Sequence, residues 1–70
     1  MFSHKLNILQ YVCYHNAESV FNYLREMLKD EPERRKELAA YPEPYGGNMA
    51  IHFAVLKGNR RIISALINEF

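Results

Sequence analysis

Cys13 and His15, two residues apart, are the side chains of this chain best suited to covalent chemistry. A cysteine thiolate beside an imidazole base is a pairing used in nucleophilic catalysis, and both side chains are common zinc ligands. On a helix, however, residues two apart point to different sides, so the imidazole would not reach the thiol. The remaining ligands of a zinc site are also missing. We therefore expect Cys13 to behave as a small buried hydrophobic residue.

No other pattern in the sequence supports a reaction. Gly46-Gly47 is not followed by the Lys-Ser/Thr pair of a phosphate-binding loop, and the metalloprotease pattern H-E-x-x-H is absent. Glu26 and Asp30 lie one helical turn apart, but a surface helix offers nothing to bury such a pair or to prepare it for proton transfer. The sequence therefore predicts a protein without catalytic activity, cofactor or metal ion.

The elements that would hold these residues are amphipathic helices, and the clearest pair lies at 47–70. A first apolar stripe with helical period is formed by Ile51, Ala54 and Val55. Gly58-Asn59 interrupts it, and glycine suits a helix end because it adopts positive φ without steric cost. A second stripe follows, formed by Ile62, Ile63, Leu66, Ile67 and Phe70. The pattern predicts two helices joined by a tight turn.

This stretch resembles an ankyrin repeat, a helix-turn-helix unit with the signature G-x-T-P-L-H-x-A-A, then a glycine, then a helix rich in Ile, Val and Leu. The positions that match by residue type are Gly47, Ile51, His52, Ala54, Gly58, Ile62, Ile63, Leu66 and Ile67. Met49-Ala50 replaces the usual Thr-Pro, and losing the hydroxyl cap costs about 1 kcal/mol. The resemblance implies an all-α fold, a short α-solenoid of stacked hairpins that binds proteins.

A fainter copy lies 42 residues upstream. Leu9, Gln10, Asn16, Val20, Phe21 and Leu24 stand opposite Ile51, His52, Gly58, Ile62, Ile63 and Leu66. Asparagine is the commonest non-glycine residue with positive φ, so Asn16 can replace the turn glycine. Two unrelated amphipathic helices would be the alternative explanation. Since an ankyrin period is about 33 residues, the second copy implies an insertion of about nine.

The insertion is predicted at about residues 30–46, between repeat one (about 5–29) and repeat two (47–70) of a single domain, 1–70. Pro32 suits the first turn of a helix, residues 33–41 are good helix formers, and Pro42-Glu-Pro44 ends the helix. We expect a short helix followed by a loop. Its charges predict a solvated face, in which Glu31 pairs with Arg34 and Arg35; a partner site is the alternative.

The resemblance implies structural roles for His52 and Gln10. In ankyrin repeats, the histidine at this position ties the start of the first helix to neighbouring backbone, and both ring nitrogens can serve this purpose. Gln10 stands at the equivalent position of the fainter copy, where its amide can replace the imidazole.

The resemblance also implies a partner-binding surface, made by the loop and by the exposed edge of the first helix of each repeat. The positions predicted there are Tyr14, His15, Tyr45, Gly46, Asn48, Leu56 and Lys57. Tyr14 and Tyr45 would supply the large amphipathic anchors that dominate interface energetics. The alternative is that Tyr14 and Leu56 pack locally beneath the inserted segment.

Composition excludes several classes of partner. With a net charge of +1 and interleaved acidic and basic residues, the chain has no electrostatic footprint for nucleic acid, and Arg60-Arg61 is the only basic pair in the clearer repeat. No apolar run approaches the roughly twenty residues needed to span a membrane. A single cysteine and no glycosylation sequon point to an intracellular, cytoplasmic location.

The last helix ends on apolar residues, whereas a terminal repeat usually presents charge outward. The residues concerned are Ile63, Leu66, Ile67 and Phe70. Three explanations are open: the chain is a fragment of a longer array, a partner covers this face, or the chain self-associates through it. The third makes a small helical oligomerisation unit the alternative function.

Overall fold

The computed structural model describes residues 6–70, which form five α-helices and no strand. The helices are α1 (Ile8–Tyr14), α2 (Glu18–Met27), α3 (Pro32–Ala40), α4 (Ala50–Lys57) and α5 (Arg60–Glu69). The all-α class expected from the sequence is confirmed for this part of the chain. The predicted start of the first repeat, at residue 5, lies outside the described residues.

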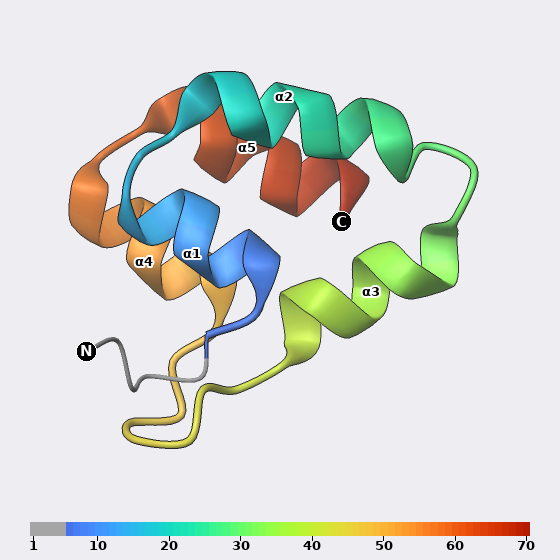
Figure 1. Cartoon of the computed structure of the whole chain (residues 1–70). Helices are drawn as coiled ribbons and strands as arrows, with labels where there is room; N and C mark the ends of the chain where they lie inside the picture. The colour runs from blue at the N-terminus through green and yellow to red at the C-terminus, as the bar shows by residue number, and fades with distance from the viewer. Residues whose placement is uncertain (1–5) are drawn as a thin grey trace.

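The helices are arranged as two hairpins, α1–α2 and α4–α5, with α3 beside them (Figure 1). Within each hairpin the two helices run in opposite directions. α1 packs against α4, and α2 lies along α5 (Figure 1). α3 contacts α1 and α4 at one end of the assembly. α3 therefore closes one end of the pair of hairpins (Figure 1).

The hydrophobic core lies between the two hairpins. α4 and α5 contribute small side chains, and those of Ala50, Ala54 and Ala65 are at most 5% exposed. Small residues let neighbouring helices approach closely, and larger side chains then fill the remaining space. The larger core residues are Leu9, Val12, Cys13, Phe21, Leu24, Leu28, Ile62 and Leu66.

Both hairpin turns contain a residue in the left-handed conformation expected from the sequence. Gly58 has φ 72° and Asn16 has φ 54°. Asn59 joins the two turns, because its Nδ2 donates to Asn16 Oδ1 at 2.7 Å while its own Oδ1 accepts from the Ile62 N–H at 3.1 Å. One asparagine thus caps α5 and fixes the spacing of the hairpins at this end.

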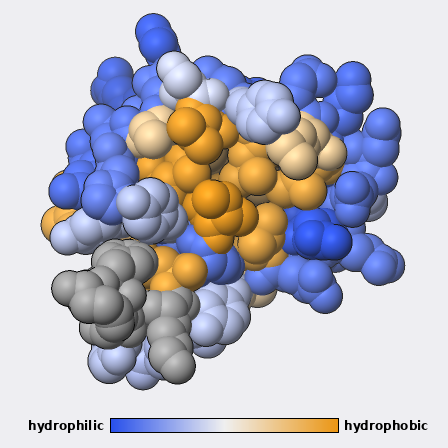
Figure 2. All heavy atoms as spheres, in the orientation of Figure 1, coloured by the Kyte–Doolittle hydropathy of each residue, from blue (hydrophilic) through white to orange (hydrophobic). Residues whose placement is uncertain are grey.

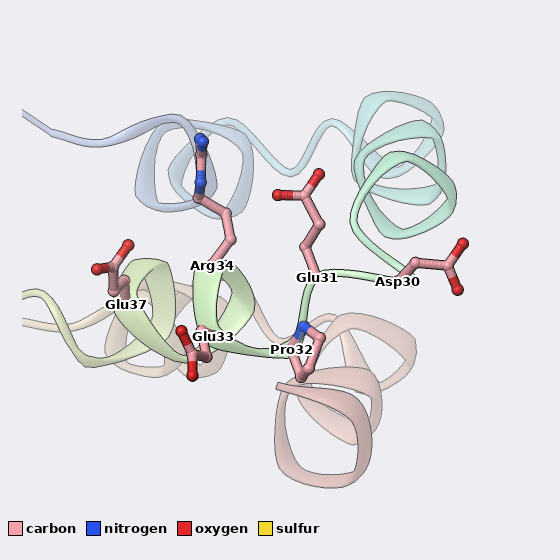
Figure 3. Close-up of a pocket in the computed structure, with 6 residues that line it drawn as sticks. All are labelled: Asp30, Glu31, Pro32, Glu33, Arg34 and Glu37. Carbon is pink, nitrogen blue, oxygen red and sulfur yellow. The ribbon is translucent and has the colours of Figure 1, made fainter.

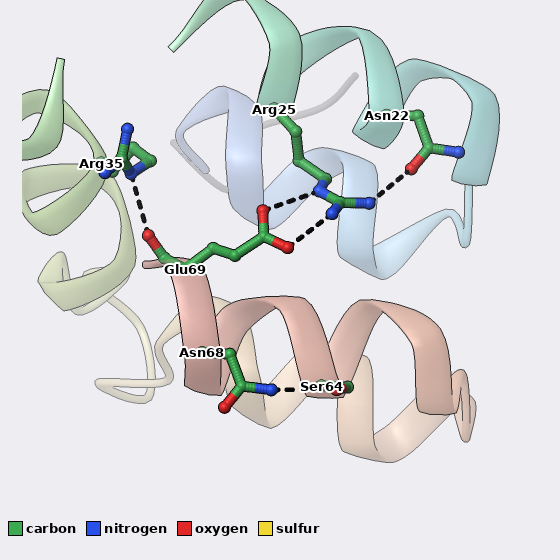
Figure 4. Close-up of polar contacts among 6 residues, drawn as sticks. All are labelled: Asn22, Arg25, Arg35, Ser64, Asn68 and Glu69. Carbon is green, nitrogen blue, oxygen red and sulfur yellow. Dashed lines mark hydrogen bonds and ion pairs between the residues drawn. The ribbon is translucent and has the colours of Figure 1, made fainter. Parts of the chain in front are cut away.

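Arg35 fastens α3 to the ends of α2 and α5. Its Nε donates to the Glu69 carbonyl at 2.8 Å (Figure 4). Its Nη1 donates to the carbonyls of Leu28 and Lys29. These carbonyls lie at or just beyond the ends of α2 and α5, where a cation is favourable, and that of Leu28 also accepts the Glu31 N–H at 3.0 Å. The expected pairing of Arg35 with Glu31 is not observed, because the guanidinium is committed to the helix ends.

A second arginine joins α2 directly to α5. Arg25 binds both carboxylate oxygens of Glu69 in a bidentate ion pair, and its other nitrogen donates to Asn22 Oδ1 (Figure 4). The aromatic rings of Phe21 and Phe70 stack beneath it, with centroids 5.9 Å apart. The C-terminal residue Phe70 is therefore half-buried against α2.

Candidate protein-binding surface

Aromatic and basic side chains gather where α1 and α4 end. The ring of Tyr14 meets that of Phe53 edge to face, with centroids 5.8 Å apart. Lys57 Nζ lies 4.9 Å from the centre of the Tyr14 ring, and the His15 ring lies 5.1 Å from it. The helices bring Tyr14, His15 and Lys57, three of the predicted surface residues, into one cluster.

The cluster is organised around Tyr14, whose side chain remains 39% exposed. Phe53 supports its ring edge, and the Lys57 ammonium interacts with the ring by a cation–π contact. A tyrosine held in this way loses little conformational entropy on binding, which makes it an efficient anchor. We call Tyr14, His15, Phe53 and Lys57 the tyrosine cluster.

A hollow of about 210 Å³ adjoins the tyrosine cluster. It is lined by Leu6, Tyr14, Glu43, Asn48 and Phe53. Ligand pockets for small molecules are typically about 300–1,000 Å³, so this hollow suits one side chain of a partner better than a cofactor. Tyr14 and Asn48 were predicted at the surface from the sequence, whereas Phe53, Leu6 and Glu43 were missed.

Glu43 builds the loop that forms one wall of the hollow. Its carboxylate accepts hydrogen bonds from the backbone N–H of Tyr45 at 2.8 Å, Gly46 at 2.9 Å and Asn48 at 3.1 Å, and from Asn48 Nδ2 at 3.1 Å. The residue is only 6% exposed. A carboxylate accepting several N–H donors is a strong local clamp, and it holds the loop in one conformation.

The clamp leaves little room for a side chain at position 46. A Cβ at Gly46 would lie 3.1 Å from Glu43 Oε2 and 3.1 Å from Asn48 Nδ2, closer than ordinary van der Waals contact. Gly46 was predicted as a partner contact, and the structure gives it a role in the loop itself.

Replacing Glu43 with glutamine is expected to weaken the acid sensitivity of the protein. The N–H of Asn48 is the main cause that lowers the pKa of Glu43 in the folded chain, and the N–H groups of Tyr45 and Gly46 act in the same direction. A lowered folded-state pKa adds stability above the pKa of the unfolded chain, and this stability is lost as pH falls through the folded value. Glu43→Gln should lower the urea midpoint at pH 7 and lose less stability than wild type towards pH 3.

The control for this experiment is Glu37→Gln, which changes an exposed carboxylate of α3. It should keep the pH profile of the wild-type protein. Glu18, whose pKa is lowered chiefly by its hydrogen bond with Arg61, contributes equally to every variant and cancels in the comparison. If Glu43→Gln and wild type lost stability in parallel between pH 7 and pH 3, the Glu43 clamp would be refuted.

Tyr45 and Leu56, two further residues predicted at the surface, are exposed but are not part of the tyrosine cluster. Tyr45 is on the loop, and Leu56 is on the last turn of α4 with 71% of its surface exposed. That exposure contradicts the alternative in which Leu56 packs beneath the inserted segment. Tyr14 does make local contacts, with Phe53 and Lys57, yet it is still accessible.

His52 and Gln10 each bind the backbone that opens their helix. His52 Nδ1 accepts the Met49 N–H at 2.7 Å, and Gln10 Oε1 accepts the Asn7 N–H at 3.1 Å. Met49 supplies no side-chain cap for α4. The start of this helix is tied instead by His52, whose ring accepts the backbone N–H of Met49. The two residues make the same local contact at equivalent positions.

Gln10 has further partners that His52 lacks. It is fully buried, and its Nε2 donates to the carbonyls of Tyr41 at 2.6 Å and Asn48 at 3.2 Å. These carbonyls flank the loop after α3. Gln10 therefore joins α1 to both ends of that loop. It thereby holds in place the loop that forms one wall of the hollow beside the tyrosine cluster.

A shallow acidic groove at the start of α3 was a second candidate. It is lined by Asp30, Glu31, Pro32, Glu33, Arg34 and Glu37. Figure 3 shows the carboxylates pointing in different directions instead of towards one centre. Among residues 6–70, no group of three metal-ligating side chains gathers. The carboxylates of this groove therefore do not converge on one site (Figure 3).

Cys13 is packed in the core. Its side chain is fully buried, and burial raises the pKa of its thiol to about 12. A thiol with such a pKa stays protonated at neutral pH and is a poor nucleophile. The geometry agrees with the packing role expected for this residue.

Comparison with known proteins gave no relative. No protein-family model matches the chain, and neither a curated protein nor a solved structure is significantly similar to it. Within the described part of the chain, none of the helices is both long and apolar enough to cross a bilayer. The function is therefore inferred from the surface of the molecule.

Proposed function

We propose that this chain is a non-catalytic protein-protein interaction module of the ankyrin type. Its partner would bind across the ends of α1 and α4 and along the loop at residues 42–48. Two features support the ankyrin assignment: paired hairpins with left-handed turn residues, and an N-terminal tether at the third residue of each first helix. The inserted α3 and its loop would take the place of the finger between repeats.

The observation that carries the proposal is the tyrosine cluster beside a side-chain-sized hollow. Tyr14 offers an apolar face and a hydroxyl, and Lys57 and His15 add hydrogen-bond donors at its rim. A rigid aromatic anchor with polar groups around it is the usual composition of an interaction hot spot. The partner that fits has an apolar side chain for the hollow next to a carboxylate for Lys57.

Loss of Tyr14 is expected to abolish most of the partner affinity. Peptides selected on the wild-type chain from a random displayed library should bind Tyr14→Ala at least about tenfold more weakly, the range of a hot-spot truncation. The double variant Tyr14→Ala/Tyr45→Ala should bind more weakly still and keep its helicity by circular dichroism. Binding is measured by fluorescence anisotropy with a labelled peptide.

The matched control is Tyr23→Ala, which truncates an exposed tyrosine of α2 outside the proposed surface. It should bind the same peptides with wild-type affinity. The proposal fails if selection returns no common peptide sequence, or if Tyr14→Ala and Tyr23→Ala bind alike.

The alternative function, self-association through the C-terminal helix, would use only part of the surface expected from the sequence. Leu66 is only 7% exposed, and Phe70 stacks on Phe21 within the molecule. Of the residues Ile63, Leu66, Ile67 and Phe70, only Ile67 is strongly exposed. A charge at Leu66 would therefore unfold the chain instead of dissociating an oligomer.

A further inference from the structure

The two hairpins are equivalent along their length with a constant shift of 42 residues. α2 runs from Glu18 to Met27 and α5 from Arg60 to Glu69, so both ends of these helices correspond. The left-handed residues Asn16 and Gly58 are also 42 apart. Every position in α1–α2 therefore has a counterpart in α4–α5, and the burial of counterparts can be compared.

The outer side of α4–α5 carries apolar residues at the positions that α1–α2 buries in the core, but nothing within the molecule covers them fully. Leu9, Cys13 and Phe21 of the first hairpin lie in the core, each at most 1% exposed. Their counterparts are again apolar, but the structure leaves them half-buried or exposed: Ile51, Val55 and Ile63. Ile67, the counterpart of Arg25, is 70% exposed. We call Ile51, Val55, Leu56, Ile63 and Ile67 the tail face.

The outer side of α1–α2 shows the converse. Ala50, Ile62 and Ala65 of the second hairpin are buried in the core. Their counterparts in the first hairpin are large, apolar or aromatic, and exposed: Ile8, Val20 and Tyr23. In Figure 1, α1 and α2 lie in front, and Figure 2 shows apolar side chains gathered at the middle of this side. We call Ile8, Tyr11, Val20, Tyr23 and Met27 the head face.

Each contact between the two hairpins of one molecule predicts a contact between the tail face of that molecule and the head face of another. Ile67 is the counterpart of Arg25, and Met27 is the counterpart of Glu69. The Arg25–Glu69 contact, repeated between two molecules, therefore places Ile67 of one opposite Met27 of the other. Both are apolar, and they are 70% and 57% exposed. An ion pair between the hairpins inside the molecule thus has two exposed apolar residues as its external counterpart.

The edge-to-face contact between Tyr14 and Phe53 behaves in the same way. Leu56 is the counterpart of Tyr14, and Tyr11 is the counterpart of Phe53. The same contact between two molecules therefore places Leu56 of one opposite Tyr11 of the other. Leu56 is 71% exposed and Tyr11 is 44% exposed. Both shifted pairs are complementary, which is expected where one packing arrangement continues beyond the chain.

We propose that a second copy of this chain packs its head face on the tail face, continuing the stacking of α1–α2 on α4–α5. Because the two faces differ, the contact is heterologous: each bound copy still presents a free tail face, so growth does not stop at a dimer. The assembly buries Ile67 against Met27 and Leu56 against Tyr11. This self-assembly goes beyond the proposed partner binding and needs no second protein.

Sedimentation of the purified chain tests the proposal. Over a series from about 10 µM to about 1 mM, the weight-average mass of wild type should rise beyond that of a dimer, as mass action requires for open growth. Ile67→Arg, a blocked tail, and Met27→Arg, a blocked head, should each stay monomeric. An equimolar mixture of the two has one free tail and one free head, so its mass should stop at that of one 1:1 dimer.

Asn68→Arg is the matched control, since it adds the same charge one residue further along α5, beside the groove between α2 and α5. It should assemble as wild type does. Leu56→Arg provides an independent blocked tail, and circular dichroism establishes that each variant is folded. Three results would overturn the proposal: a monomeric wild type throughout the series, Met27→Arg assembling normally, or a mixture that stays monomeric.

Discussion

Replacing Gln10 with glutamate is expected to lower the free energy of unfolding by about 3–5 kcal/mol, the cost of an uncompensated buried charge. The change is nearly isosteric and leaves the Asn7 N–H with an acceptor. The Nε2 position, however, becomes an oxygen that faces the carbonyl oxygens of Tyr41 and Asn48. Urea unfolding followed by circular dichroism at pH 7 measures the loss.

The same chemical change at an exposed site supplies the control. Asn22→Asp converts an amide into a carboxylate on α2, where the side chain already accepts from Arg25. It should change the free energy of unfolding by no more than about 0.5 kcal/mol. Equal effects of the two substitutions would show that Gln10 does not make its buried contacts.

The second large effect is expected at Arg35. Arg35→Met keeps much of the aliphatic stem but removes the side-chain donors to the carbonyls of Leu28, Lys29 and Glu69. Hydrogen bonds to a charged group contribute about 1.5–3 kcal/mol each, and partial solvent access reduces what is lost here. We expect a loss of about 2 kcal/mol in urea unfolding, with faster amide hydrogen exchange at the ends of α2 and α5.

Two variants show whether the guanidinium itself is responsible. Arg35→Lys keeps the charge but cannot reach the ends of two helices at once, so it should recover only part of the loss. Arg34→Met, at the neighbouring exposed position of α3, should leave stability close to that of wild type. If Arg34→Met destabilised the chain as strongly as Arg35→Met, the role assigned to Arg35 would be wrong.

The helices themselves were largely predictable. The period of the apolar residues after Gly58 predicts α5, and Pro32 with Pro42 and Pro44 predicts the bounds of α3 to within one residue. The left-handed turn at Gly58 also follows from residue type. These features depend on the chain within a few residues, because backbone preference and helical period are local properties.

The contacts that hold the helices together were not predictable in the same way. Glu43 lies between two prolines that predict only the end of a helix, yet its carboxylate organises the loop beside the tyrosine cluster. Arg35 was expected on a solvated face and instead fastens two helix ends. In both cases the partners are backbone groups, which have no signature in the sequence.

Sequence pattern alone determined where the helices lie, which residue could take positive φ at each turn, and that His52 and Gln10 stand at matching positions. Only the tertiary structure decided which apolar side chains are covered. Leu66 and Ile67 are neighbours of similar hydrophobicity on α5, yet one is in the core and the other is 70% exposed. Helical period assigns both to one broad stripe, whereas burial depends on where α1 and α2 pack, and that is set by contacts between residues some forty positions apart.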